Sequence, residues 1–392
     1  MSARDTNKPP YNPAMLRWAR EWRGRSIDDA AKKVGKKPQD ILDWENSVSA
    51  PTVRQARELA HFYDRAFLEF FLPEPPPQKG ANEIADFRIY KGQQPDKTWE
   101  LDSYHRWAES QRENALELFS ELGEEPTKLP QGIFCTLATS PDVAAARARE
   151  ILDFPIQEQT DLRSADMNDL PSILRRKFEA KGVLTFRESR LKGLGVRGIC
   201  IAAFPLPAIV FTSESPAAQA FTLAHEFGHI LLKESGITGP RSAQYEQQPI
   251  EKWCDSFAAA FLMPFALVQA LLGEKPDAPL PSISDESLES VARTIRVSTH
   301  AMLIRLVNLG YVASAYYWDV KRPQFAKAEA EYEGFGIPKF YANRFRTNLG
   351  DLYTGLVLDA WSSSRITNDT AAQYMGIKKF AYLEQIRKAF RE

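Results

Sequence analysis

The stretch Thr222–Leu232, which reads TLAHEFGHILL, determines how the rest of this sequence is interpreted. It contains the pattern His-Glu-x-x-His, in which His225 and His229 are separated by one helical turn. Residues at this spacing lie on one face of a helix, so both imidazoles can point at a single metal ion. Glu226 follows the first histidine, where its carboxylate can reach a water molecule on that ion. Two nitrogen ligands, an open position for water and an adjacent base are typical of a zinc hydrolase.

The residues around the motif predict a mostly buried helix. Apolar side chains flank the two histidines, and Ser215-Pro216 is typical of an N-cap followed by proline at the first helical position. The alternative is a core helix that carries two ordinary histidines, each bonded to a neighbour. The metal interpretation is favoured because two imidazoles and a carboxylate on an apolar helix are unfavourable unless a partner satisfies them.

A catalytic zinc normally takes a third protein ligand, and the best candidates lie between Glu251 and Pro264. This segment predicts a second helix, which Pro264 breaks or kinks. Glu251 lies in its first turn, Asp255 lies one turn later on the same face, and Cys254 is a softer alternative. We favour Glu251, because it completes a thermolysin-like His, His, Glu site. Asp255 would then orient a histidine, unless it is a solvated helix residue. One zinc ion per chain is expected, and manganese or iron would also suit these ligands.

Length and composition indicate a multidomain globular protein without membrane segments. The 392 residues are enough for two or three domains, and the hydrophobic fraction of 44% is ordinary for a globular chain. A net charge of −1 provides no global field for nucleic acid or membrane, so such contacts need a local patch. Three widely spaced cysteines argue against a disulfide framework. Residues 1–10 are polar and lack the apolar core of a signal peptide. We therefore expect a cytoplasmic protein with no membrane partner.

Residues 12–72 predict an N-terminal bundle of five short helices. These are expected at about 15–22, 26–34 and 38–46, with a fourth that begins at 52 and a fifth at 65–72. Gly35 makes a tight turn between the second and third, as in a helix-turn-helix whose later helix enters the DNA major groove.

Several polar residues of this bundle are candidates for DNA contacts. Gln39 and Asp43 would lie on the exposed face of the reading helix. Basic residues suited to phosphate contacts include Arg17, Arg20, Arg25, Lys36 and Lys37. The alternative is a small helical docking domain that has lost DNA binding, because acidic residues nearly match the basic ones in number.

Short sequence words in this segment resemble the phage-repressor, or Xre-type, helix-turn-helix family. These words are Leu16-Arg17, Ala30-Ala31 and Trp44-Glu45-Asn46, followed by Pro51 and Leu59-Ala60. Asn46-Ser47 departs from the family pattern, which often has a glycine there. The resemblance implies DNA as a partner of the N-terminal domain.

The middle of the chain divides into two predicted regions. Residues 73–130 hold a proline-rich linker and a long helix. Residues 131–270 predict a zincin-like α+β metallopeptidase domain, in which an edge strand can hold an extended peptide. Its helices and strands ahead of the metal helix are expected at 141–152 and 170–180, then at 182–186, 198–203 and 208–211. A surface loop is expected over 233–249, where Tyr245 is either an oxyanion donor or an exposed aromatic residue.

Residues 271–392 predict a mainly helical C-terminal region. Helices are expected at 285–295 and 298–309, and core packing explains their apolar spacing although the pair resembles a helix-turn-helix. A strand at 315–318 and two or three further helices follow. The predicted fold class is therefore multidomain and mostly α with a small β-sheet: a five-helix helix-turn-helix bundle, a zincin-like α+β metallopeptidase domain and a C-terminal helical region.

Two blocks of the chain together resemble the ImmA/IrrE family of zinc metallopeptidases. The first is Phe221–Leu231, and the second is Phe257–Pro264, which reads FAAAFLMP. In that family a glutamate ligand precedes the second block by six residues, which is Glu251 here. The resemblance implies that His225, His229 and Glu251 bind zinc and that Glu226 is the base. It also implies a peptidase that cuts transcriptional repressors in a stress or phage response.

One stretch departs from this family. Ala218-Gln219-Ala220 stands where an arginine often precedes the first block. The change can alter a substrate contact or a structural salt bridge, but it leaves the zinc site intact.

We therefore expect a zinc-dependent endopeptidase joined to a DNA-binding domain, with a protein substrate, and a homodimer is compatible with the sequence. The alternative is a DNA-binding transcriptional regulator or an antitoxin-like protein whose metallopeptidase fold is a sensor or scaffold. Glu226 favours the enzyme, because a scaffold does not need a base beside its metal.

Overall fold

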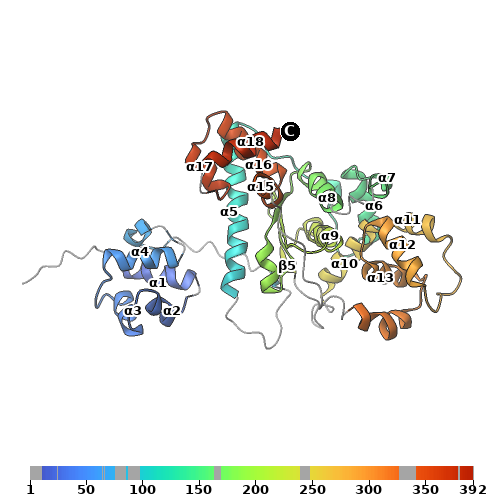
Figure 1. Cartoon of the computed structure of the whole chain (residues 1–392), viewed down its shortest axis with the longest axis horizontal. Coiled ribbons are helices and arrows are strands. Elements are labelled where there is room, and N and C mark those ends of the chain that lie inside the picture. The colour runs from blue at the N-terminus through green and yellow to red at the C-terminus, as the bar shows by residue number, and fades with distance from the viewer. Residues whose placement is uncertain are drawn as a thin grey trace, which may run out of the picture. The chain divides into compact units, whose positions relative to one another are not determined.

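The computed structural model describes residues 11–23, 25–63, 65, 67–75, 85–86, 98–162, 169–238, 248–325, 341–377 and 380–391. The chain separates into two compact units. The first comprises residues 1–83 and 95–103, and the second comprises residues 84–94 and 104–392. Most described residues are helical, and the strands form one small mixed sheet in the second unit (Figure 1).

The first unit is a bundle of short helices with its own apolar core. Its elements are α1 (Pro13–Trp22), α2 (Ile27–Lys33), α3 (Pro38–Glu45), α4 (Val53–Phe62) and the 3-10 helix η1 (Phe67–Phe71). Side chains start the helices as their sequences predict: Ser26 accepts from the Asp29 N–H, and Thr52 forms a capping box with Gln55. The predicted fifth helix is only a short 3-10 segment, which packs on α1 and α4.

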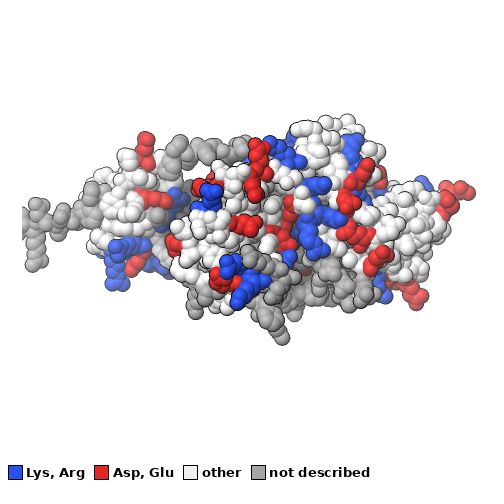
Figure 2. Space-filling model, turned by 90° about the horizontal axis from the view of Figure 1, so that it is seen from above, with Lys and Arg blue, Asp and Glu red and all other residues white. Residues whose placement is uncertain are grey.

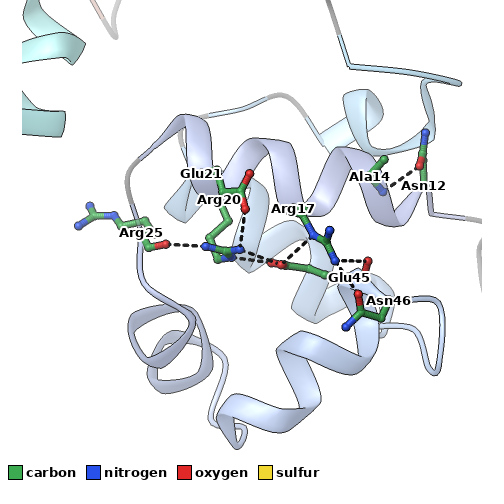
Figure 3. A network of polar contacts seen from close by, with 8 residues as sticks. All are labelled: Asn12, Ala14, Arg17, Arg20, Glu21, Arg25, Glu45 and Asn46. Atoms are coloured by element: carbon green, nitrogen blue, oxygen red, sulfur yellow. Dashed lines mark hydrogen bonds and ion pairs between the residues drawn. The ribbon is translucent and has the colours of Figure 1, made fainter.

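A buried ion pair ties α1 to α3 (Figure 3). Arg20 donates from Nε and Nη2 to the two carboxylate oxygens of Glu45, at 2.6 and 2.8 Å. Arg20 also donates from Nη1 to the carbonyl of Arg25 at 3.1 Å, and Arg17 donates to the Asn46 side chain at 2.5 Å. Both partners of the central pair are buried, and bidentate geometry makes such pairs strong. The expectation that Arg20 contacts phosphate is therefore wrong, because its guanidinium is enclosed by this network.

The second unit contains a five-stranded sheet in the order β1-β5-β3-β4-β2. Its strands are β1 (Ala85–Asp86), β2 (Leu184–Arg187), β3 (Gly198–Ile201), β4 (Ala208–Phe211) and β5 (Gly236–Thr238). The pairs β3–β4 and β3–β5 are antiparallel, whereas β2–β4 and β1–β5 are parallel.

Strand β5 corrects one sequence prediction. Residues 236–238 fall in the segment 233–249 that was expected to be a surface loop. They pair instead with β3, with Gly198 opposite Thr238 and Cys200 opposite Gly236. Three residues are too few to show the alternation of polar and apolar side chains that marks a strand. The pairing is decided instead by the side of β3 that is not paired with β4.

Helices cover the sheet and enclose the main core. They are α5 (Thr98–Leu122), α6 (Pro141–Ile151), α7 (Ile156–Thr160), α8 (Asp169–Glu179), α9 (Pro216–Leu232), α10 (Pro249–Leu262), α11 (Phe265–Leu272), α12 (Asp285–Ile295) and α13 (Thr299–Leu309), with 3-10 helices η3 (Gln131–Ile133) and η5 (Ser189–Leu194). The central helix α9 packs against α8, α10, β3 and β4. One continuous hydrophobic core runs from Leu129 to Tyr317 and includes α12 and α13. Their apolar residues are buried in it, in agreement with the predicted packing role.

The C-terminal helices are anchored to the sheet side of this unit. They are α15 (Tyr341–Leu349), α16 (Asp351–Ser362), α17 (Asn368–Tyr374) and α18 (Ala381–Arg391). Helix α15 packs against β2, and Glu179 of α8 accepts hydrogen bonds from the N–H groups of Asp351 and Leu352 at 2.8 and 3.0 Å. Gly350 precedes α16 with φ +80°, where a Cβ atom would lie 2.3 Å from the Glu179 carboxylate. The buried glutamate thus caps α16 through a position that only glycine fits.

Residues 315–318 are not a strand. They fall in a helical segment that includes the π-helix η7 (Tyr316–Lys321). A short apolar run such as this fits strand and helix equally well, so its sequence alone was ambiguous.

No single helix among the described residues is long and apolar enough to cross a membrane, and only the bent pair α10 and α11 passes that test together.

Buried polar side chains bind the carbonyl groups at the end of α10. Arg149 Nη1 donates to the Phe261 carbonyl at 2.7 Å and to Gln159 Oε1 at 2.9 Å. Gln159 Nε2 donates to the carbonyls of Leu262 and Ile295 at 2.9 and 2.7 Å. The last carbonyls of a helix lack partners inside it, and these two side chains supply them. The network therefore joins α6, α7 and α12 to the end of α10.

We predict that Arg149→Met destabilises the second unit by about 3 kcal/mol, because it leaves a buried carbonyl and the Gln159 amide oxygen without their donor. Chemical denaturation followed by circular dichroism measures the loss. Arg147→Met is the matched control, since Arg147 lies on the same helix, is partly exposed and donates to the Gly132 carbonyl at 3.1 Å. Its effect should stay below about 1 kcal/mol. Equal losses in the two variants would contradict a specific role for Arg149.

Candidate metal centre

Helix α9 presents His225 and His229 toward α10. Its start is set locally, because the Ser215 hydroxyl accepts from the Ala218 N–H at 3.3 Å and Pro216 takes the first helical position. The helix ends at Leu232, and Lys233 follows it as the C-cap residue with φ +60°. Both histidines are buried, with exposed fractions of 2% and 0%. The motif thus lies on the inner face of α9, as its apolar flanks predicted.

Helix α10 brings Glu251 to the same point. Its carboxylate oxygens lie 3.2 Å from His225 Nε2 and 3.1 Å from His229 Nε2. The two Nε2 atoms are 3.2 Å apart. Glu251 is completely buried, and these three residues form the potential metal-binding group among the described residues. Residues 22 to 26 positions apart in the sequence therefore converge on one small volume.

The size of this triangle fits a tetrahedral ion. Zinc binds histidine nitrogen at about 2.0–2.1 Å and carboxylate oxygen at about 2.0–2.2 Å, so neighbouring ligand atoms around it lie about 3.3–3.4 Å apart. The two Nε2 atoms are 3.2 Å apart, and each lies 3.1 to 3.2 Å from a different oxygen of the Glu251 carboxylate, so the separations come close to that value. The donor set of two imidazoles and one carboxylate also leaves a fourth position open, as catalytic sites do. The residues present therefore fit the metal that the motif implies.

Electrostatics of the protein alone also favour a cation here. Burial by itself would lower the pKa of His225, but hydrogen bonds to Asp255 and Glu251 outweigh burial and raise that pKa to about 10. Burial would raise the pKa of Glu251, but hydrogen bonds to His225 and His229 lower it well below its ordinary value. A positive charge between these groups is thus strongly stabilised, whether it is a proton or a metal ion.

The helix-turn-helix and metal-site regions each match a known family. Residues 207–307 match the sequence model of the IrrE N-terminal-like domain of the M78 peptidases, and residues 16–70 match that of the helix-turn-helix. This chain joins a helix-turn-helix domain to an ImmA/IrrE-type domain. No curated protein matches the chain. A metallopeptidase-like protein with a DNA-binding type of domain is the function class that these matches support.

The structure shows where the two alternatives to Glu251 as third ligand, Asp255 and Cys254, lie in the ImmA/IrrE-type domain. Asp255 Oδ1 lies 3.1 Å from His225 Nδ1, the ring nitrogen that faces away from Glu251. A carboxylate in this position fixes the tautomer and orientation of a ligating histidine. Cys254 is buried, and burial followed by the nearby Glu251 and Glu226 carboxylates raises the pKa of its thiol well above the ordinary value. Among the described residues, the ligand atoms that converge at the centre do not include the Cys254 thiol, which lies in the surrounding hydrophobic core.

Glu226 lies directly beside the ligands on α9 and is fully buried. A Cβ atom at Gly198 of β3 would lie 2.2 Å from Glu226 Oε1, so this carboxylate rests against the start of that strand. The sequence did not predict the close approach of Glu226 to Gly198, since a lone glycine in a predicted strand does not indicate which side chain lies against it. Tyr245, the candidate oxyanion donor, lies outside the described residues.

The predicted DNA contacts of the helix-turn-helix domain are mostly solvent-accessible. Lys36, Lys37 and Gln39 are exposed, and Gln39 Nε2 donates to Asp43 Oδ1 at 2.8 Å along α3. The Arg25 guanidinium lies 4.5 Å from the centre of the Phe62 ring. In Figure 2 acidic and basic side chains are interspersed over the visible face, in keeping with the net charge of −1. DNA affinity would therefore have to come from a few local contacts.

We predict that the purified protein holds about one zinc ion per chain and that Glu251→Ala loses it, because the remaining two histidines leave the ion short of a ligand. Elemental analysis after dialysis measures the content. Asp255→Asn should keep the site but weaken zinc affinity by about 10- to 100-fold. Glu234→Ala, which changes an exposed carboxylate next to α9, is the control and should bind zinc normally. Full zinc content in Glu251→Ala would contradict the three-ligand site.

Proposed function

We propose that this chain is a zinc-dependent endopeptidase that cleaves a transcriptional repressor, and that its N-terminal domain binds DNA. The observation that supports the enzyme best is the buried triangle of His225, His229 and Glu251 with Glu226 beside it. A sensor or scaffold would need the ligands but has no use for a second buried carboxylate at the same place. The match to an M78 peptidase domain supports the same reaction class.

The proposed chemistry assigns separate roles to the chain's own residues. His225, His229 and Glu251 would hold the ion, and Asp255 would keep His225 in the ligating orientation. Bound zinc would supply Lewis acidity toward water and the peptide carbonyl. Glu226 would accept the proton of the attacking water at its carboxylate and deliver it to the leaving amine nitrogen. Buried surroundings strengthen each of these electrostatic contacts.

A cytoplasmic location, where a repressor would be met, is also part of this proposal, and the low cysteine content of the chain supports it. DNA binding through Arg25, Lys36, Lys37, Gln39 and Asp43 would bring the peptidase close to a repressor on its operator. A homodimer would let two such domains bind two half-sites.

We predict that Glu226→Gln abolishes proteolysis while zinc content stays near one per chain, because the amide is similar in shape but cannot accept a proton. A lysate of the source cells is treated with the wild-type protein or with Glu226→Gln, and new protein N-termini are identified by mass spectrometry. The expected result is a small set of cuts, made only by the wild-type protein, that includes a helix-turn-helix repressor. Cuts of equal extent by both proteins would refute the role of Glu226. Cuts confined to unrelated proteins would refute the repressor as substrate.

We also predict that the double variant Lys36→Gln, Lys37→Gln binds DNA more weakly, with a salt dependence shallower by about two units of log affinity per log salt concentration. Each lysine that contacts a phosphate releases about one counterion, and the substitution removes that contribution. Fluorescence anisotropy with mixed-sequence duplex DNA over a salt series measures the slope. Lys32→Gln, Lys33→Gln is a charge-matched comparison on α2. An unchanged slope in the Lys36, Lys37 variant would exclude phosphate contacts by these residues.

A further inference from the structure

We propose that Gly198 is a positioning residue for Glu226: the missing side chain at the start of β3 provides the space that the carboxylate occupies beside the metal ligands. This inference rests on the proposed peptidase function for its catalytic consequence. Its steric part stands on geometry alone and can be tested without a substrate.

Three atoms of the glutamate crowd the position of a side chain at residue 198. A Cβ atom there would lie 2.2 Å from Glu226 Oε1, 2.6 Å from Cδ and 2.8 Å from Cγ. All three distances are far below ordinary contact, so a rotation of the terminal carboxylate alone does not relieve the overlap. The glutamate would have to change its inner side-chain angles, which turns the carboxylate away from its present place.

Neither the backbone of Gly198 nor the Glu226 side chain has room to move apart from the other. Gly198 pairs with Phe211 of β4 on one side and with Thr238 of β5 on the other, so its backbone is held within the sheet. Glu226 is completely buried on α9, which packs directly against β3 and β4. Packed interiors adjust little to added atoms, so an extra methyl group must displace the side chain it meets.

The neighbouring strand residue shows that this face of β3 lies at the metal centre. Cys200 shares the face of Gly198, since alternate residues of a strand point the same way. Burial, followed by the charges of Glu226 and Glu251, raises the pKa of the Cys200 thiol well above its ordinary value. The geometry at Gly198 agrees with this, since it is the point on this face where the strand has no side chain between its backbone and the Glu226 carboxylate.

The steric part is tested by a double-mutant cycle of thermal stability with Gly198→Ala, Glu226→Ala and the two combined. Gly198→Ala should lower the melting temperature of the zinc-loaded protein by more than about 2 °C. The same change should have a much smaller effect when Glu226 is already alanine, because the overlapping atoms are gone. If Gly198→Ala alone fails to fold, recovery of folded protein in the double variant is the equivalent result. Equal losses in both backgrounds, or an unfolded double variant, would overturn the proposal.

The catalytic part uses a quenched-fluorescent peptide that spans a site cut in the lysate experiment. Gly198→Ala should keep its zinc and its KM but lose about 100-fold in kcat, as expected when a reacting group is displaced by about 1 Å. Gly193→Ala, where a Cβ atom meets nothing within 4 Å, is the control and should cleave normally. An unchanged kcat in Gly198→Ala would overturn the positioning role. An inactive, zinc-loaded wild-type protein would instead refute the proposed function, and the stability cycle would still decide how Glu226 is held.

Discussion

The structure depends on placing one carboxylate against two imidazoles inside an apolar core. Glu251 lies within 3.2 Å of both histidine Nε2 atoms, and none of the three residues is more than 2% exposed. Burying a carboxylate is strongly unfavourable unless a positive charge balances it, and here a proton or a metal ion between the carboxylate and the imidazoles would do so. The centre therefore requires α9 and α10 to keep one relative position, and much of the second unit serves that requirement.

Both ends of α10 are held by polar contacts from other elements. Near its start, the Trp253 indole donates to the Thr139 carbonyl at 2.8 Å ahead of α6. At its end, Arg149 and Gln159 bind its last carbonyls, and Arg305 of α13 donates to the Met263 carbonyl at 3.1 Å. Each contact satisfies a group that would otherwise be buried without a partner, so the helix has little freedom to shift. A rigid α10 in turn keeps the ligand triangle near the size that a tetrahedral ion needs.

In the N-terminal unit, the residues that indicate the fold are mostly different from the residues expected to contact DNA. The sequence words that resemble the repressor family are largely structural: Ala30, Ala31, Trp44, Leu59 and Ala60 are buried in the core of the bundle. Glu45 is occupied by Arg20. Arg17 is the partly exposed exception among these words, and its guanidinium donates to the Asn46 side chain. The exposed residues Lys36, Lys37 and Gln39 lie outside them, so DNA specificity has to be read from other positions.

The sequence by itself determined the local structure and which residue types can meet at the candidate centre. Ser215, Pro216 and the Thr52–Gln55 box mark helix starts within a single turn, and the spacing of His225 and His229 places two imidazoles on one face. These patterns span only a few residues, so they can be recognised in the sequence. Only the tertiary structure decided which contacts join distant segments. It placed Asp255 on His225, formed β5 along β3, made residues 315–318 helical and brought Gly198 against Glu226. Those outcomes depend on how helices and strands pack, which short-range sequence patterns do not encode.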